Sequence, residues 1–247
     1  MFTVAEKISG DKMIKAVIFD LDNTIMDFMA MKENALTAAV KAMIDAGLNV
    51  ERGDALGELY DIYDREGIEY QNVFDIFLKK NLGAIDWKIL SSGVVAYRKA
   101  REASLVTYPH VDLTLTELLR KGLKLAVLSD APRREAWLRL CYLHLQHTFD
   151  TVITFEDTGL KKPDLTPFKK VLSLIDVSPE ETLMVGDWPE RDLVGAQEAG
   201  MRTVFARYGF AFKRTPVGRE GADYVIDDIR ELLEIIDEVN NKEGASK

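Results

Sequence analysis

Cysteine and histidine are scarce in this sequence of 247 residues. Its single cysteine is Cys141, so no disulfide can form within the chain. A lone thiol is typical of a reducing compartment, so we expect a cytoplasmic protein, with Cys141 on the apolar face of a helix. The three histidines, His110, His144 and His147, lack the spacing of a metal site. These absences exclude a scaffold held by internal disulfides and favour structural roles for the histidines.

Long apolar runs and an excess of basic residues are also missing. No stretch of about 18 or more apolar residues occurs, so we expect no membrane-spanning helix. The first 12 residues are mixed polar and lack the apolar segment of a signal peptide. With 32 Lys and Arg against 41 Asp and Glu, the formal net charge is −9. Binding to a nucleic-acid backbone requires clustered Lys and Arg, so we expect neither a nucleic-acid nor a membrane partner.

Short apolar segments alternate with amphipathic segments over most of the chain. The short segments predict strands at residues 14–19, 124–128, 151–154, 182–185, 203–206 and 224–226. Apolar residues at helical spacing predict helices at residues 112–121, 133–143, 166–175, 190–199 and 227–239. Strands that alternate with helices predict an α/β fold, with a Rossmann-like parallel sheet and helices on both of its faces.

The stretch between the first and second predicted strands is different, because it contains only helical patterns. Four helices are predicted there, at residues 29–46, 52–65, 69–81 and 86–103, and Asp86 is the expected N-cap of the last. We therefore expect an inserted all-helical cap domain of four helices over residues 27–104. The catalytic core would then consist of residues 1–26 and 105–247, although the residues before the first strand contribute nothing to the fold prediction.

Polar side chains stand where several predicted strands end. Asp20 and Asp22 follow the first strand, Ser129 follows the second, and Asp187 follows a later one. Lys162 lies in a loop before a helix, which places it on the same edge. Because ligands of open α/β sheets bind beyond the carboxyl ends of the strands, we expect these side chains to form one site.

The chemistry of these groups points to phosphoryl transfer. Converging carboxylates repel one another and need a cation, and oxygen ligands without His or Cys suit Mg²⁺. A metal ion, a lysine and a hydroxyl group together can bind phosphate. One carboxylate could attack phosphorus and form an aspartyl phosphate, while another protonates the leaving group and later activates water.

Four segments resemble the motifs of the haloacid dehalogenase superfamily, in the same order. They are D-L-D-N-T at residues 20–24, the serine after K-L-A-V-L, K-P-D at residues 162–164, and V-G-D-W-P-E-R-D at residues 185–192. The resemblance covers residues 15–207, and the helical insert is similar to the cap of the phosphoglycolate phosphatase and dehalogenase branch. It implies a Mg²⁺-dependent phosphatase that hydrolyses small-molecule phosphate monoesters.

The resemblance also implies a role for each residue of the first and second motifs. Asp20 would be the nucleophile and a magnesium ligand. Asp22 would be the general acid and base, and its backbone carbonyl would be a second ligand. Thr24 would orient the loop of motif one and, with Ser129 and Lys162, would belong to the phosphate-binding group.

The third and fourth motifs supply the remaining charges. By the same resemblance, Lys162 would neutralise charge on the phosphoryl group and on Asp20. Asp187 would bind magnesium directly. Asp192 would support the metal site and Lys162 without contacting the metal.

Some neighbours of the motifs have simpler interpretations. Asp130 is interpreted as the N-cap of the helix that begins at Arg133. Lys161, next to Lys162, is expected to be exposed. Trp188 occupies a motif-four position where the family often has a smaller residue, and it either shields the site or packs.

Several alternatives remain open on the same scaffold. A phosphonatase would need a cap lysine for a Schiff base, and Lys32 and Lys41 of the first cap helix lack a distinctive context. A 2-haloacid dehalogenase would share the fold, but its first motif typically has no acid at the position of Asp22, since no leaving group needs protonation. A phosphomutase would differ in its product from a sugar phosphate. A non-catalytic binding protein would show decayed motifs, whereas all four are intact.

Overall fold

The computed structural model describes residues 12–211, 216 and 218–244, and the chain divides into two compact units. One unit contains Met1–Met26 and Thr107–Lys247, and the other is Asp27–Val106. Residues 1–11, which the prediction assigned to the core, and residues 245–247 of the polar tail lie outside the described residues. No helix in the described part of the chain is long and apolar enough to cross a membrane.

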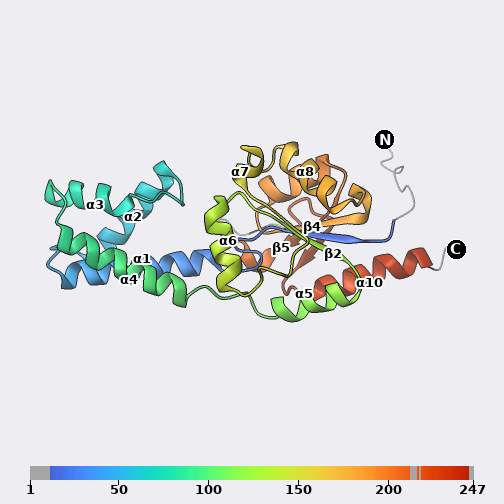
Figure 1. The fold of residues 1–247 in the computed structure, drawn as a ribbon, viewed down its shortest axis with the longest axis horizontal. Coiled ribbons are helices and arrows are strands. Elements are labelled where there is room, and N and C mark those ends of the chain that lie inside the picture. The colour runs from blue at the N-terminus through green and yellow to red at the C-terminus, as the bar shows by residue number, and fades with distance from the viewer. Residues whose placement is uncertain (1–11, 212–215, 217, 245–247) are drawn as a thin grey trace. The chain divides into compact units, whose positions relative to one another are not determined.

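The larger unit is built on a six-stranded parallel sheet with the strand order β3-β2-β1-β4-β5-β6. In Figure 1, helices lie on both sides of the labelled strands β2, β4 and β5. The strands are β1 (Ala16–Phe19), β2 (Lys124–Leu128), β3 (Thr151–Ile153), β4 (Thr182–Gly186), β5 (Arg202–Ala206) and β6 (Tyr224–Ile226). β1 pairs with β2 on one side and with β4 on the other. The predicted α/β fold with a Rossmann-like parallel sheet is confirmed.

Helices cover both faces of this sheet. They are α5 (Val111–Arg120), α6 (Arg133–Tyr142), α7 (Phe155–Thr158), α8 (Leu165–Ile175), α9 (Val194–Glu198) and α10 (Glu231–Gly244). Successive side chains of a strand point to opposite faces. Val17 and Phe19 accordingly join the cluster that includes α5 and α10, whereas Ala16 and Ile18 join the cluster that includes α8. Burial on both faces explains why β1 is a continuous apolar run.

Several predicted features of the helices differ from the structure. The helix predicted at residues 69–81 begins at Val73. The last helix begins at Glu231 instead of residue 227, because Asp228 accepts a hydrogen bond from the Arg230 N–H at 2.9 Å and forms a turn first. Cys141 is exposed, since Ala136, Arg139 and Leu140 form the buried face of α6.

The smaller unit contains four helices in its described residues: α1 (Phe28–Asp45), α2 (Arg52–Glu66), α3 (Val73–Leu82) and α4 (Trp87–Ala103). They share one hydrophobic cluster of their own. Asp86 caps α4 as predicted, accepting hydrogen bonds from the N–H groups of Lys88 and Ile89. A β-carbon at Gly93 would lie 2.1 Å from the methyl carbon of Met43, so glycine permits the close packing of α4 on α1.

Candidate active site

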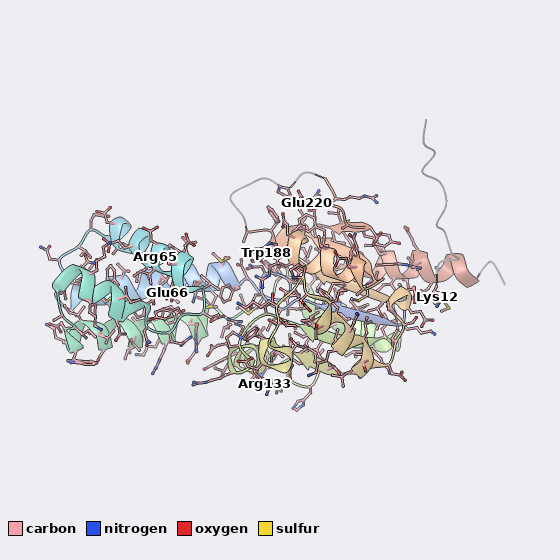
Figure 2. The ribbon with its side chains drawn as sticks, turned by 90° about the horizontal axis from the view of Figure 1, so that it is seen from above. Lys12, Arg65, Glu66, Arg133, Trp188 and Glu220 are labelled. Carbon is pink, nitrogen blue, oxygen red and sulfur yellow. The ribbon has the colours of Figure 1, made fainter. Side chains whose placement is uncertain are left out.

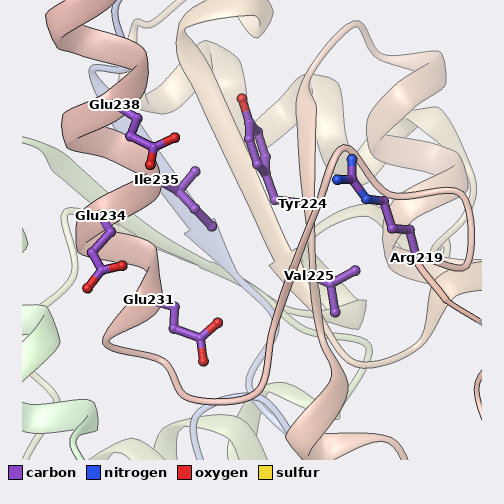
Figure 3. A pocket seen from close by; sticks show the side chains of 7 residues that line it. All are labelled: Arg219, Tyr224, Val225, Glu231, Glu234, Ile235 and Glu238. Carbon is purple, nitrogen blue, oxygen red and sulfur yellow. The ribbon is translucent and has the colours of Figure 1, made fainter.

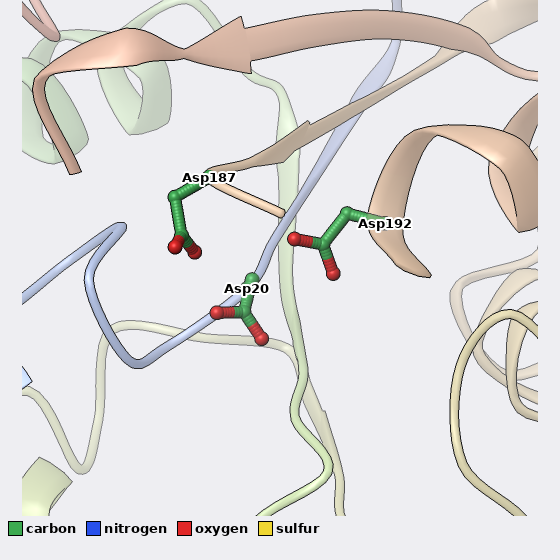
Figure 4. A group of neighbouring side chains, drawn as sticks. All are labelled: Asp20, Asp187 and Asp192. Carbon is green, nitrogen blue, oxygen red and sulfur yellow. The ribbon is translucent and has the colours of Figure 1, made fainter. Parts of the chain in front are cut away.

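The carboxyl ends of β1 and β4 bring acidic residues together. The strands are in register, with Phe19 opposite Val185, so Asp20 and Asp187 follow them at the same edge. Asp192 joins them from a π-helical turn, Pro189–Leu193. All three acids are buried, and each offers one oxygen within 4.8 Å of the others (Figure 4). The structure therefore gathers three of the predicted residues into one cluster.

Gly186 makes the approach of Asp192 possible. A β-carbon at Gly186 would lie 2.4 Å from the Oδ2 atom of Asp192, which is closer than real contacts allow. Asp192 Oδ2 also accepts a hydrogen bond from the Trp188 N–H at 3.0 Å. The π-helical turn thus folds Asp192 back over the strand end, and it replaces the first half of the regular helix predicted for residues 190–199.

Lys162 connects two of the acids. Its Nζ atom lies 2.5 Å from Asp20 Oδ1 and 2.6 Å from Asp192 Oδ1. Nζ also donates to the carbonyl oxygen of Leu128 at 3.0 Å. Lys162 is buried, whereas the neighbouring Lys161 is exposed, as predicted. The ammonium group is therefore fixed among three oxygens at the strand ends.

The cluster has more negative than positive charge. Burial raises the pKa of Asp20 to about 7; Lys162 opposes this rise, and Asp192 and Asp22 add to it. Burial also raises the pKa of Asp187 well above its usual range, with further contributions from Asp20 and Asp192. Burial alone would lower the pKa of Lys162, but Asp192 and Asp20 outweigh it and leave the pKa above its usual value.

These features fit a metal ion. A cation would offset the burial and the mutual repulsion that raise the carboxylate pKa values, and the cluster Asp20, Asp187 and Asp192 offers oxygen atoms alone. The buried acidic group could therefore bind a metal ion.

Two hydroxyl groups were predicted to belong to the site, those of Thr24 and Ser129. Thr24 Oγ1 donates to Asp187 Oδ1 at 3.2 Å, and both side chains are buried. Ser129 follows β2, and its Oγ accepts a hydrogen bond from the Ala131 N–H at 3.1 Å. An accepted bond orients the hydroxyl oxygen and leaves its proton as a donor. The phosphate contacts expected of Thr24 and Ser129 stay predictions.

Comparisons with known proteins identify the family of this chain. The sequence pattern of the haloacid dehalogenase-like hydrolases matches residues 17–206. The chain belongs to the haloacid dehalogenase-like hydrolase family. This confirms the resemblance carried by the four motifs.

Curated relatives of this haloacid dehalogenase-like hydrolase are named as phosphatases. A glyceraldehyde 3-phosphate phosphatase from Methanocaldococcus jannaschii is 40% identical over 224 residues, which cover 91% of this chain and 97% of that protein. A protein of the same name from Methanothermobacter thermautotrophicus is 33% identical, and the match covers 91% of this chain and all of that protein.

A solved structure shows the same fold. The putative hydrolase of this family from Bacillus subtilis, which was solved bound to magnesium, has a TM-score of 0.66 and 22% identity. The match covers 91% of this chain and 99% of that one.

Asp130 has a different role from the predicted helix cap, and that prediction is wrong. The N-cap residue of α6 is Pro132. Asp130 instead accepts a hydrogen bond from the Lys162 N–H at 2.9 Å and pairs with Arg191. Arg191 in turn lies over the ring of Trp188, with its Cζ atom 4.4 Å from the ring centroid. Trp188 is 36% exposed, and Figure 2 labels its position in the larger unit. This hydrolase thus ties the loops of its second, third and fourth motifs together through one carboxylate.

The segment after β5 also supports the site, although no sequence signal selected it. The hydroxyl of Tyr208 donates to the carbonyl oxygen of Thr24 at 2.8 Å. Burial raises the pKa of Tyr208, which keeps this hydroxyl protonated as a donor. A β-carbon at Gly209 would lie 1.6 Å from the carbonyl oxygen of Asn23, so the two backbones touch there. The loop of motif one therefore rests on residues far away in the sequence.

A pocket elsewhere in the larger unit contains none of the predicted residues. It has a volume of about 290 Å³ and lies beside α10 (Figure 3). Its lining residues are Arg219, Tyr224, Val225, Glu231, Glu234, Ile235 and Glu238. The charged groups of motifs one to four do not reach it, so the acidic cluster remains the candidate active site.

Proposed function

We propose that this protein is a Mg²⁺-dependent phosphatase that hydrolyses small-molecule phosphate monoesters through a phosphoryl group carried on Asp20. The observation that carries the proposal is the buried cluster of Asp20, Asp187 and Asp192 around Lys162. Hydrolysis of phosphate esters agrees with the names of relatives that match most of this chain. The identity of the metal is part of the proposal, and oxygen ligands favour Mg²⁺.

In the first step, a carboxylate oxygen of Asp20 forms a bond to phosphorus as the ester oxygen departs. Asp22 gives its proton to that oxygen, which leaves as an alcohol. Lys162 neutralises charge on the phosphoryl group, and Ser129 donates a hydrogen bond to it. Asp20, Asp187 and the backbone carbonyl of Asp22 would hold Mg²⁺, which supplies charge neutralisation when bound.

In the second step, Asp22 takes a proton from a water molecule, and the water oxygen bonds to phosphorus. The bond from phosphorus to Asp20 breaks, which releases phosphate and restores the carboxylate. Asp192 takes no part in bond making. It holds Lys162 at 2.6 Å and so keeps the ammonium group in place through both steps.

The substrate we propose first is glyceraldehyde 3-phosphate. Relatives from five archaeal sources carry the name glyceraldehyde 3-phosphate phosphatase, at 32% to 40% identity over at least 91% of this chain. We further propose that residues 27–104 act as a cap that selects among esters, while the core binds the phosphate group.

An ester panel in the presence and absence of metal tests this function. The panel contains glyceraldehyde 3-phosphate, phosphoglycolate, an aryl phosphate and a 2-haloacid. Hydrolysis of the esters should vanish with EDTA and return with Mg²⁺, and the haloacid should not react. Full activity of the metal-free enzyme would contradict the metal proposal, and halide release would favour the dehalogenase.

A further inference from the structure

Arg139 is a buried cation that the motifs do not explain. It lies on α6, and its side chain is 6% exposed. Ala136 and Leu140 share its helix face and are fully buried in the core. An arginine in such a position is unusual, since buried charges are costly unless they are paired.

Arg139 forms an ion pair with Asp22. The Nη1 atom donates to Asp22 Oδ2 at 2.8 Å, across 117 residues of sequence. The Asp22 side chain is 23% exposed, so the pair has one buried and one partly open member. A charge-assisted bond of this length is directional, and it restricts the rotation of the carboxylate.

The backbone on the other side of Asp22 is fixed as well. The Asn23 N–H donates to the Met26 carbonyl at 2.7 Å, and the Ile25 N–H donates to the Leu21 carbonyl at 3.0 Å. Leu21 and Ile25 pack in the same hydrophobic cluster as the buried face of α6. Both ends of the ion pair are therefore anchored in one packed layer, which fixes the direction in which Asp22 points.

We propose that Arg139 is a positioning residue that holds the Asp22 carboxylate in place for proton transfer. The proposal rests on the acid and base role proposed above for Asp22. Arg139 itself exchanges no proton, because a guanidinium does not lose its charge in proteins. Its contribution is to keep Asp22 near one orientation, and misplacement of a catalytic group is costly in rate.

A positioning role predicts a dependence on the leaving group. An alkyl phosphate has a poor leaving group that needs a proton, whereas a nitrophenolate leaves without one. Arg139→Met should therefore lower kcat/KM for glycerol phosphate about tenfold more than for p-nitrophenyl phosphate, because Asp22 is present but less often in place. Arg139→Lys, which keeps a cation, should recover part of the loss.

The test is a double-mutant cycle measured with both esters. Arg139→Met, Asp22→Asn and the double variant are compared with wild type, and the exposed Arg134 of the same helix provides the control Arg134→Met. The ratio of the kcat/KM values for the two esters does not depend on how much of the enzyme is folded. If the methionine variant fails to fold, Arg139→Lys provides this ratio instead. Arg139→Met should add no further loss to Asp22→Asn, since Arg139 acts through Asp22.

Two results would overturn the proposal: an equal loss for both esters, or a loss that persists in the Asp22→Asn background. The proposed role of Asp22 fails separately. If Asp22→Asn alone shows no greater loss for glycerol phosphate than for p-nitrophenyl phosphate, the acid and base assignment is wrong, whatever Arg139 does.

Discussion

Asp20 is the residue at which the charge interactions of the site meet. Its carboxylate forms an ion pair with Lys162. Burial, together with the charges of Asp192 and Asp22, raises its pKa to about 7. A nucleophile must be ionised, so a metal-free site would hold Asp20 only partly ready near neutral pH. The same arrangement that suits a bound cation is therefore unfavourable without one.

This conflict predicts a stability change in the metal-free protein. The pKa of Asp20 rises from 3.8 to about 7 on folding, so the folded state loses stability as pH rises through that range. Asp20→Asn removes the charge but leaves Lys162 paired with Asp192. In EDTA at pH 8 the variant should melt higher than wild type, by roughly 2–4 °C for each 1 kcal/mol of relief.

The advantage of Asp20→Asn should shrink toward pH 4, where the wild-type carboxyl is protonated. Differential scanning calorimetry across this pH range measures the difference in melting temperature between the variant and wild type. Asp61→Asn, at an exposed position on α2, is the control and should not alter the pH dependence. A variant that melts lower than wild type at pH 8, or that differs from wild type by the same amount at every pH, would show that burial and the nearby acids do not disfavour the charged form of Asp20.

At the scale of elements, the loop of motif one depends on the segment that follows β5. Gly209 lies where any side chain would overlap the carbonyl of Asn23. Gly209→Ala should push this loop away from the acidic cluster and lower kcat/KM by about 10²-fold, the cost of misplacing catalytic groups by roughly 1 Å. The melting temperature should fall as well, since the backbone at Asn23 has to move.

Gly57 provides the matched control for this substitution. It lies on α2, and a β-carbon there would meet nothing within 4 Å. Gly57→Ala should leave activity unchanged and stabilise the helix by about 0.5–1 kcal/mol. If Gly209→Ala kept wild-type kinetics, the contact with Asn23 would have no role in placing the motif.

Elements with strong local patterns were predicted well from the sequence. β2 and β6 have the predicted bounds, because short apolar runs between polar residues define buried strands. Asp192 was chosen by its motif, but the π-helical turn that carries it depends on the contact with Gly186, which spacing does not reveal.

Long-range pairs were beyond the sequence for a physical reason. Arg139 pairs with Asp22 and Asp130 pairs with Arg191 only after the strands bring distant loops to one edge. One signal was available, since Arg139 interrupts an apolar helix face. A charge in that position indicates a buried partner, although it does not say which one.

At the scale of the whole molecule, the chain combines an α/β unit that contains every proposed catalytic group with a separate helical unit. This division predicts that changes in the helical unit alter substrate preference and leave metal dependence unchanged. Met29→Glu and Ala30→Glu place charge at the start of α1, close in sequence to motif one. Lys41→Glu, exposed further along α1, is the comparison.

Values of kcat/KM for several esters, with the Mg²⁺ dependence of each variant, measure this effect. The preference among esters should change by several-fold in the first two variants, since the proposed cap contacts the part of the substrate beyond the phosphate. One common factor for all esters would mean that the helical unit affects stability or chemistry in general. A shift in Mg²⁺ dependence at constant preference would contradict the division of labour.

The most direct test of the account is the location of the phosphoryl group during turnover. Asp22→Asn removes the base of the second step, so the phosphoenzyme should accumulate when an aryl phosphate and Mg²⁺ are supplied. After an acid quench, peptide mass spectrometry should find one phosphoryl group on the peptide that contains Asp20. It should find none when the reaction is run in EDTA, and none in the double variant that carries both Asp20→Asn and Asp22→Asn. A phosphoryl group on another residue, or continued turnover of the Asp20→Asn variant, would contradict the central claim.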